Sequence, residues 1–131
     1  RIVGDGERRE YLEEKVESSN LDERITFEGY VDHDKLSEYY SRAGWFVHAS
    51  KWPEPLNRTL FEAMQTETAA LCSNMGGAKD VLHEEQIFEK SSDIPEKIRN
   101  LDREEVVERQ NSKLKEYSPE KIVSRLKEVY K

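Results

Sequence analysis

Residues 44–73, GWFVHASKWPEPLNRTLFEAMQTETAALCS, decide which fold class the sequence predicts. The apolar run at 44–50 is typical of a strand covered on both faces, and residues 57–65 show the spacing of a helix. A second apolar run at 68–73 predicts another strand. Strand, helix and strand joined by short connections form the unit from which parallel sheets are built.

The same alternation extends through residues 1–90. Further strands are predicted at 1–4, 23–31 and 86–89, and further helices at 5–19, 32–43 and 78–83. Residues 91–131 read as helices only, the last of them capped by Ser118 with Pro119 at its first position. We therefore predict an α/β fold, a Rossmann-like open parallel sheet with helices on both faces, followed by a helical C-terminal tail.

Composition limits the class of protein. A chain of 131 residues with 35% hydrophobic and 37% charged residues fits one soluble domain, and no apolar run approaches the ~20 residues of a membrane-spanning helix. The net charge of −7 argues against nucleic acid as a partner, since its binding depends on clustered Lys and Arg. The single cysteine, Cys72, lies in an apolar run and is predicted to be a core residue. We expect a cytoplasmic location, with peripheral membrane attachment of the full-length protein left open.

The chain opens on RIVGDG, without Met and inside a predicted strand. We therefore expect residues 1–131 to be a single domain of a longer protein, truncated at its N-terminus. In such sheets, ligands bind beyond the carboxyl ends of the strands. The loops at 4–7, 29–32, 49–57 and 73–77 follow predicted strands, so we expect them at the ligand edge.

The loop at 49–57 and the helix after it carry the chemistry. Glu54 is held between two prolines, which restrict the backbone, and a carboxylate fixed in this way suits the hydroxyls of a ligand. Asn57 is predicted to be the helix N-cap, or a residue in the left-handed region. The N–H groups of Arg58, Thr59 and Leu60 are then expected to point outward, where the helix dipole and the arginine favour phosphate.

Glu62 follows Arg58 by one helical turn, so the two side chains share a face. A carboxylate there suits the paired hydroxyls of a ribose. The alternative is structural: an ordinary ion pair between Arg58 and Glu62, with Glu54 a solvated turn residue. Trp52 is predicted to pack in its loop, and His48 to be a packed or hydrogen-bonded residue rather than a catalytic one. For Glu54, Arg58 and Glu62, spacing alone leaves both the ligand-binding and the structural interpretation open.

The string SKWPEPLNRTLFEAM resembles the donor-site motif of family 4 glycosyltransferases, which have the GT-B fold. That family's hallmark is a pair of Glu residues with seven residues between them, as Glu54 and Glu62 have here. RIVGDG, ERITFEGYV and NMGGAKDVL resemble three further elements of the family, in the same order. The resemblance covers residues 1 to about 85 and implies half of a GT-B fold.

What the resemblance implies is the donor-binding domain of a retaining transferase. Such an enzyme moves a sugar from a nucleoside-diphosphate sugar to an acceptor hydroxyl, without a metal or other cofactor, and the acceptor (a glycan, a lipid or another hydroxyl compound) binds to an N-terminal domain that is missing here. The implied residues are Glu54 as the catalytic group at the transferred sugar, Leu56, Asn57, Arg58 and Thr59 at the diphosphate, Glu62 at the ribose, Tyr30 and Val31 at the base, and Gly76 and Gly77 close to the donor.

Some positions depart from the family pattern. Asn57 stands where the family prefers Gly, and Leu56 where it prefers Phe. The family's first strand, and the Arg and Lys that follow it, are expected before residue 1. Without the N-terminal domain, we expect this chain alone to be inactive. The alternative function is a non-catalytic Rossmann-like domain with an interaction or regulatory role.

Overall fold

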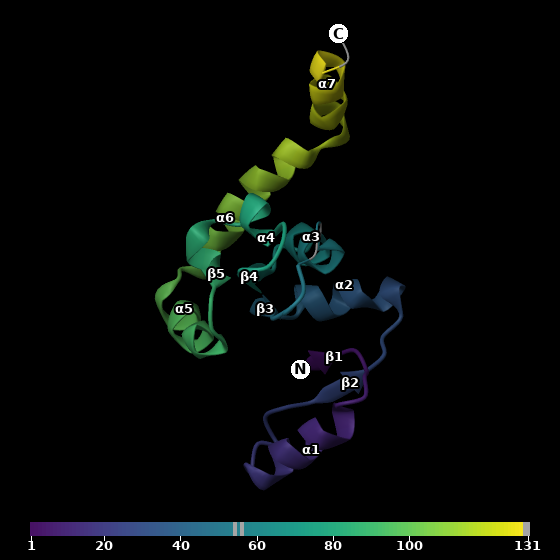
Figure 1. The fold of residues 1–131 in the computed structure, drawn as a ribbon, viewed down its shortest axis with the longest axis vertical. Coiled ribbons are helices and arrows are strands. Elements are labelled where there is room, and N and C mark those ends of the chain that lie inside the picture. Colours follow the sequence, from purple (N-terminus) through teal and green to yellow (C-terminus); the bar gives the residue numbers. More distant parts are fainter. Residues whose placement is uncertain (54, 56, 130–131) are drawn as a thin grey trace. The chain divides into compact units, whose positions relative to one another are not determined.

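The computed structural model describes residues 1–53, 55 and 57–129. The chain divides into two compact units, Arg1–Leu36 and Ser37–Lys131, which are described separately. Figure 1 follows the chain through its helices and strands. The boundary between the units falls within helix α2 (His33–Ser41).

The first unit contains β1 (Ile2–Val3), α1 (Arg9–Ser18) and β2 (Phe27–Gly29). The two strands are parallel, with Ile2 opposite Phe27. Gly29 ends β2 with a φ of +68°, and a Cβ there would lie 2.9 Å from the Arg9 guanidinium. The backbone conformation therefore favours glycine at this position, whereas the nearby Arg9 guanidinium is the end of a flexible side chain and does not by itself demand it. Arg9 itself is held by Glu13 at 2.8 Å.

The second unit continues from the end of α2 as an alternation of strands and helices. Its elements are β3 (Trp45–His48), α3 (Arg58–Gln65), β4 (Ala69–Ser73), α4 (Ala78–Val81), β5 (Ile87–Phe88), α5 (Ile94–Asn100), α6 (Arg103–Leu114) and α7 (Pro119–Val129). Three short 3-10 helices, Glu84–Gln86, Ser91–Asp93 and Lys115–Tyr117, join them. The predicted α/β alternation and the helical tail are confirmed.

The sheet of the second unit has the order β3–β4–β5, and all its strands are parallel. The central strand is buried from Ala69 through Cys72. The prediction that the apolar run at 44–50 is covered on both faces is wrong, because Val47 in β3 is 38% exposed. The physical reason is position: β3 is an edge strand of this sheet, whereas β4 has neighbours on both sides.

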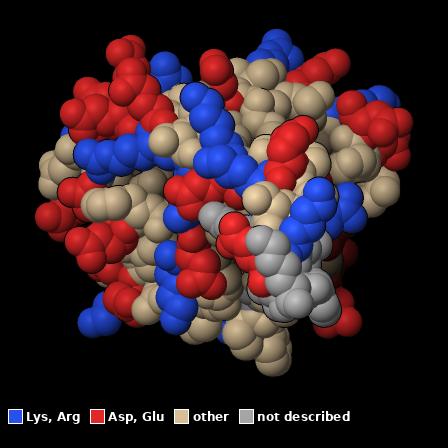
Figure 2. Space-filling view, turned by 90° about the horizontal axis from the view of Figure 1, so that it is seen from above, with Lys and Arg blue, Asp and Glu red and all other residues tan. Residues whose placement is uncertain are grey.

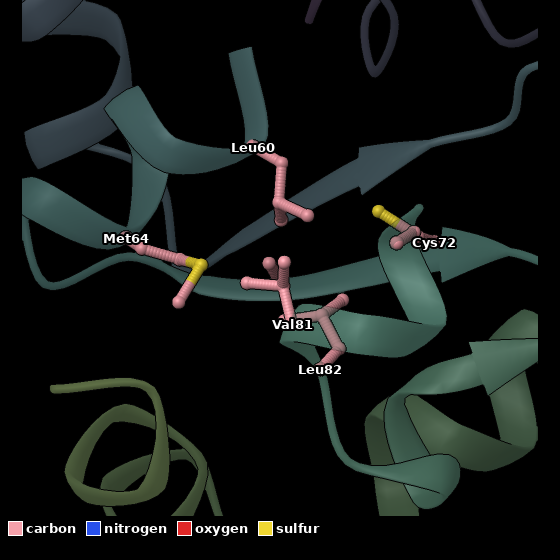
Figure 3. Packing of buried hydrophobic residues seen from close by; sticks show 7 residues of the cluster. Leu60, Met64, Cys72, Val81 and Leu82 are labelled. Atoms are coloured by element: carbon pink, nitrogen blue, oxygen red, sulfur yellow. The ribbon is translucent and has the colours of Figure 1, made fainter. Parts of the chain in front are cut away.

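A compact core joins α3, β4 and α4 (Figure 3). Leu60 and Met64 project from one face of α3 toward Val81 and Leu82, and Cys72 enters from β4. Cys72 is fully buried, so its predicted role as a core residue is confirmed. This packing fixes α3 against the sheet, and with it the position of the first turn of α3.

Two buried glutamines complete the hydrogen bonding of β4. Gln110 of α6 accepts from the Ala70 N–H at 2.9 Å through Oε1 and donates to the Thr68 carbonyl at 3.0 Å through Nε2. Gln86 donates to the Ala70 carbonyl at 2.9 Å and to Gln110 Oε1 at 2.8 Å. Because β5 pairs with β4 only at Cys72 and Ser73, these side chains take the place of a longer strand.

The last helix begins as the sequence predicts. Pro119 is its first residue, and the Ser118 Oγ accepts from the Lys121 N–H at 3.4 Å. Within the described part of the chain, no helix has both the length and the apolar character needed to cross a membrane.

Candidate functional site

The candidate site is built where β3 and β4 end. The loop at 49–57 leaves β3 and leads into α3, and a second loop leaves β4 at Ser73. The Ser73 hydroxyl donates to the Ser50 carbonyl at 2.7 Å, which ties the starts of the two loops together. The site therefore lies at the carboxyl edge of the sheet, as predicted for a ligand site in this fold class.

Asn57 caps α3. It is 6% exposed and has extended backbone angles, φ −90° and ψ 100°, so the N-cap prediction is confirmed and the left-handed alternative is wrong. Its Oδ1 accepts from the Leu60 N–H at 3.1 Å and from the Thr59 hydroxyl at 2.6 Å. Thus the prediction that the Leu60 N–H points outward is wrong, because the cap uses it. Among the described residues, no group accepts from the N–H of Arg58 or Thr59.

The cap predicts a measurable effect on stability. Replacing Asn57 by alanine removes the acceptor for the Leu60 N–H and is expected to lower the free energy of unfolding by about 1 kcal/mol. Urea unfolding of the wild type and the variant measures the difference. Asn57→Ser keeps a capping oxygen and serves as the control, and equal losses in both variants would contradict the role of the cap.

Glu62 lies on α3 one turn beyond Arg58. Its Oε1 is 3.9 Å from the Arg58 guanidinium, whose side chain is 77% exposed. The ion pair considered as the structural alternative therefore exists, but a pair this long and this exposed is worth only a few tenths of a kcal/mol. The other carboxylate oxygen, Oε2, accepts from the Tyr40 hydroxyl at 3.2 Å. The Glu62 side chain is thus contacted by both Arg58 and Tyr40, and it is 22% exposed.

Tyr40 is a member of the site that sequence reasoning missed. It is 8% exposed, and its ring meets Phe46 edge to face at 5.5 Å. Its backbone carbonyl accepts from the buried Thr68 hydroxyl at 2.7 Å. The sequence predicts a helix at 32–43, but helical spacing does not show where a hydroxyl points.

Burial, together with the charge of Glu62, raises the pKa of Tyr40 to about 12. The folded-state pKa therefore lies above the ordinary value of 10.0. Because the unfolded chain then loses this proton first, the stability linked to Tyr40 is complete below about pH 10 and is lost as the pH rises toward 12. As the pH is raised from about 9 to about 11, we expect the free energy of unfolding to fall less in Tyr40→Phe than in the wild type. Urea unfolding at each pH measures this difference. Parallel losses would contradict this pKa.

The loop after β4 contains both predicted glycines. Gly76 has a φ of +66°, so this turn requires glycine. Gly77 precedes α4 with a φ of −78°, a conformation open to any residue. Tyr30, with a 79% exposed side chain, and the half-buried Val31 follow β2 in the first unit. The structure thus brings Asn57, Arg58, Thr59 and Glu62 together at the start of α3.

Other predicted residues have different outcomes. Glu54 and Leu56 lie outside the described residues. The prediction that Trp52 packs in its loop is wrong, since this side chain is 78% exposed. His48 stacks on Phe46 with ring centroids 6.2 Å apart, which confirms a packed histidine.

Charge is mixed on the face seen in Figure 2. Figure 2 shows Lys and Arg side chains interspersed with Asp and Glu on the visible face. No group of three or more His, Cys, Asp and Glu side chains within the described ranges is placed to hold a metal ion.

Several known proteins are similar to this chain. An uncharacterized glycosyltransferase of Methanocaldococcus jannaschii is 31% identical over 84 residues, which are 64% of this chain and 21% of that protein. Mannosylfructose-phosphate synthase of Agrobacterium fabrum is 36% identical over 66 residues, 50% of this chain and 14% of that protein. The chain thus spans about a fifth or less of these curated relatives.

Solved structures show the same fold. Sucrose-phosphate synthase of Thermosynechococcus elongatus matches with a TM-score of 0.74 and 26% identity over 95% of this chain and 34% of its own. Anabaena HepE, solved in complex with UDP, matches with a TM-score of 0.74 and 18% identity over 98% of this chain and 39% of its own. Both are GT-B glycosyltransferases, so the predicted Rossmann-like half of a GT-B fold is confirmed. The model of the family "Glycosyl transferases group 1" matches residues 1–121, and the chain belongs to that family.

Proposed function

We propose that the chain is the donor-binding domain of a retaining glycosyltransferase, which moves a sugar from a nucleoside-diphosphate sugar to an acceptor hydroxyl. One observation carries the proposal: a capped helix start, whose first two N–H groups have no acceptor among the described residues, lies one turn from a carboxylate held in place. A phosphate group and a diol are the ligand groups that suit these two features.

The start of α3 receives the diphosphate. The N–H groups of Arg58 and Thr59, the positive end of the helix dipole and the exposed Arg58 guanidinium all favour an anion there. Negative charge develops on the diphosphate as the bond to the sugar breaks. Groups fixed in advance around that charge lower the barrier, since they need no reorganisation during the reaction.

Glu62 binds the ribose. As a carboxylate it only accepts hydrogen bonds, and its two oxygens offer about four acceptor positions. The Tyr40 hydroxyl donates to one of these oxygens, and the two ribose hydroxyls are proposed to donate to the same carboxylate. Glu54, in the loop before α3, accepts from hydroxyls of the transferred sugar and acts as the catalytic carboxylate. Leu56 and Asn57 belong to the segment that binds the diphosphate.

The remaining roles follow the family resemblance. Tyr30 and Val31 lie against the base, while Gly76 and Gly77 allow the backbone to approach the donor. The acceptor, a glycan, lipid or other hydroxyl compound, binds to an N-terminal domain of the full-length protein, and residues 1–131 alone do not complete the enzyme. The reaction needs no metal or cofactor, and the protein acts in the cytoplasm.

UDP is the first probe to use, because HepE was solved with UDP and with UDP-glucose. We expect UDP and UDP-glucose, or the corresponding guanosine compounds, to bind the full-length protein in isothermal titration calorimetry. The nucleoside without phosphates should bind roughly tenfold more weakly or worse, because it offers no anion to the start of α3.

A non-catalytic interaction or regulatory domain is the rival function. It predicts that neither uridine nor guanosine diphosphates bind, or that nucleoside and nucleotide bind equally weakly. Either result would overturn the proposed function. In an active enzyme, the anomeric configuration of the product, read by NMR, tests whether the transfer is retaining.

A further inference from the structure

Tyr40 lies beside the proposed ribose site without being part of it. Its hydroxyl is 3.2 Å from Glu62 Oε2, on the side of the carboxylate opposite the oxygen that approaches Arg58. We infer that Tyr40 is a positioning residue, whose hydroxyl holds the Glu62 carboxylate in the orientation that receives the ribose. This inference rests on the proposed function and adds to it a residue of a different helix.

The need for such a residue follows from the neighbours of Glu62. A glutamate side chain on a helix surface samples several rotamers, and Arg58 one turn earlier attracts it. A shorter, hydrogen-bonded ion pair between them would use the carboxylate needed by the ribose and the guanidinium needed by the diphosphate. In the structure the two charged groups stay 3.9 Å apart, while the closer contact of Glu62 is to Tyr40. The Tyr40 hydroxyl thus gives the Glu62 carboxylate a contact other than Arg58, which suits separate roles for these two residues at the ligand.

Tyr40 is suited to this role because it is fixed itself. The ring is buried and packs edge to face on Phe46 of β3. The backbone carbonyl at the same residue accepts from Thr68, just before β4. The ring contact ties Tyr40 to β3, and the carbonyl contact ties it to the residue that precedes β4. The raised pKa of Tyr40 means that the hydroxyl keeps its proton, which it must donate to an ionised carboxylate.

The test is Tyr40→Phe in the full-length protein, a change that keeps the ring and removes only the hydroxyl. We expect the affinity for UDP to fall by about tenfold, the effect of one hydrogen bond to a charged group. In steady-state kinetics, KM for the sugar nucleotide should rise while kcat stays within about twofold, because the hydroxyl acts on binding rather than on the reacting bond.

Tyr117→Phe is the matched control. Its hydroxyl also makes one hydrogen bond, to the Asp80 carbonyl at 3.4 Å, and its ring also packs edge to face on an aromatic side chain, Phe61. The substitution is chemically identical, so a general loss of stability would affect both variants. We expect Tyr117→Phe to bind UDP as the wild type does.

A double-variant cycle separates positioning from an independent contribution. If Tyr40 acts through Glu62, Tyr40→Phe should weaken binding no further once Glu62 is already glutamine. Additive losses, or an unchanged affinity in Tyr40→Phe when the wild type binds, would overturn this inference alone. A wild type that binds neither uridine nor guanosine diphosphates would instead overturn the proposed function, and the inference with it.

Discussion

Replacing Glu62 by glutamine in the full-length protein is expected to weaken nucleoside-diphosphate binding by roughly 10- to 100-fold, the effect of losing hydrogen bonds to a charged acceptor. Glutamine keeps the size of the side chain but replaces one acceptor oxygen by a donor NH₂ group. That group cannot accept from a ribose hydroxyl, and the Tyr40 hydroxyl competes for the remaining oxygen. Isothermal titration calorimetry with UDP, UDP-glucose and the guanosine compounds measures the loss.

Glu67→Gln is the control for this substitution. Glu67 follows the C-terminal end of α3, at the opposite end of the helix from the proposed site, and its side chain is exposed. The Glu67→Gln substitution removes the same charge from the same region of the chain, and we expect UDP affinity to stay at the wild-type level. Equal losses in the two variants would show that net charge, rather than the position of Glu62, governs binding. An unchanged affinity in Glu62→Gln would contradict the ribose assignment.

Replacing Glu54 by glutamine is expected to have the largest effect on the reaction, lowering kcat by roughly 100-fold or more while the affinity for the nucleotide changes little. A carboxylate at the transferred sugar interacts most strongly when charge develops near the reacting carbon, so its loss acts on the transition state. In the proposed site the nucleotide half of the donor is held by α3 and Glu62, so we expect this change not to affect it.

Single-turnover and steady-state kinetics of Glu54→Gln, together with direct titration of UDP and of the intact sugar nucleotide, separate these effects. Glu54→Asp serves as a second variant, because it keeps the charge but moves it back by one methylene group. It should recover part of the turnover only if position and charge both matter. If nucleotide affinity fell and turnover at saturating donor did not, Glu54 would belong to the nucleotide end of the site.

Much of the fold could be predicted because local signals agree with one another. Three such signals are the apolar run of β4, the cap at Asn57 and the pair of Ser118 and Pro119. Each is encoded within a few consecutive residues. Such signals locate elements and their starts. The family resemblance indicated which loops and helices form the candidate site. The family and the GT-B fold are confirmed.

What could not be predicted depends on contacts distant in sequence. Gln110 completes the hydrogen bonding of Thr68 and Ala70 across about forty residues, and no periodic pattern reports such a contact. Tyr40 and Glu62 are separated by 22 positions, and only the packing of α2 and α3 brings the hydroxyl to the carboxylate. The exposure of Val47 likewise depends on strand order, which an apolar run does not encode.

The ribose contact of Glu62 is the claim on which the donor site depends most. Its most direct test is the ratio of the affinities for UDP and for its 2′,3′-dideoxy analogue, measured in the wild type and in Glu62→Gln. We expect the wild type to prefer UDP by roughly tenfold or more, and the preference to shrink to about twofold in the variant. A preference of equal size in both proteins would show that the ribose hydroxyls are bound elsewhere, and that the carboxylate beside the start of α3 has another role.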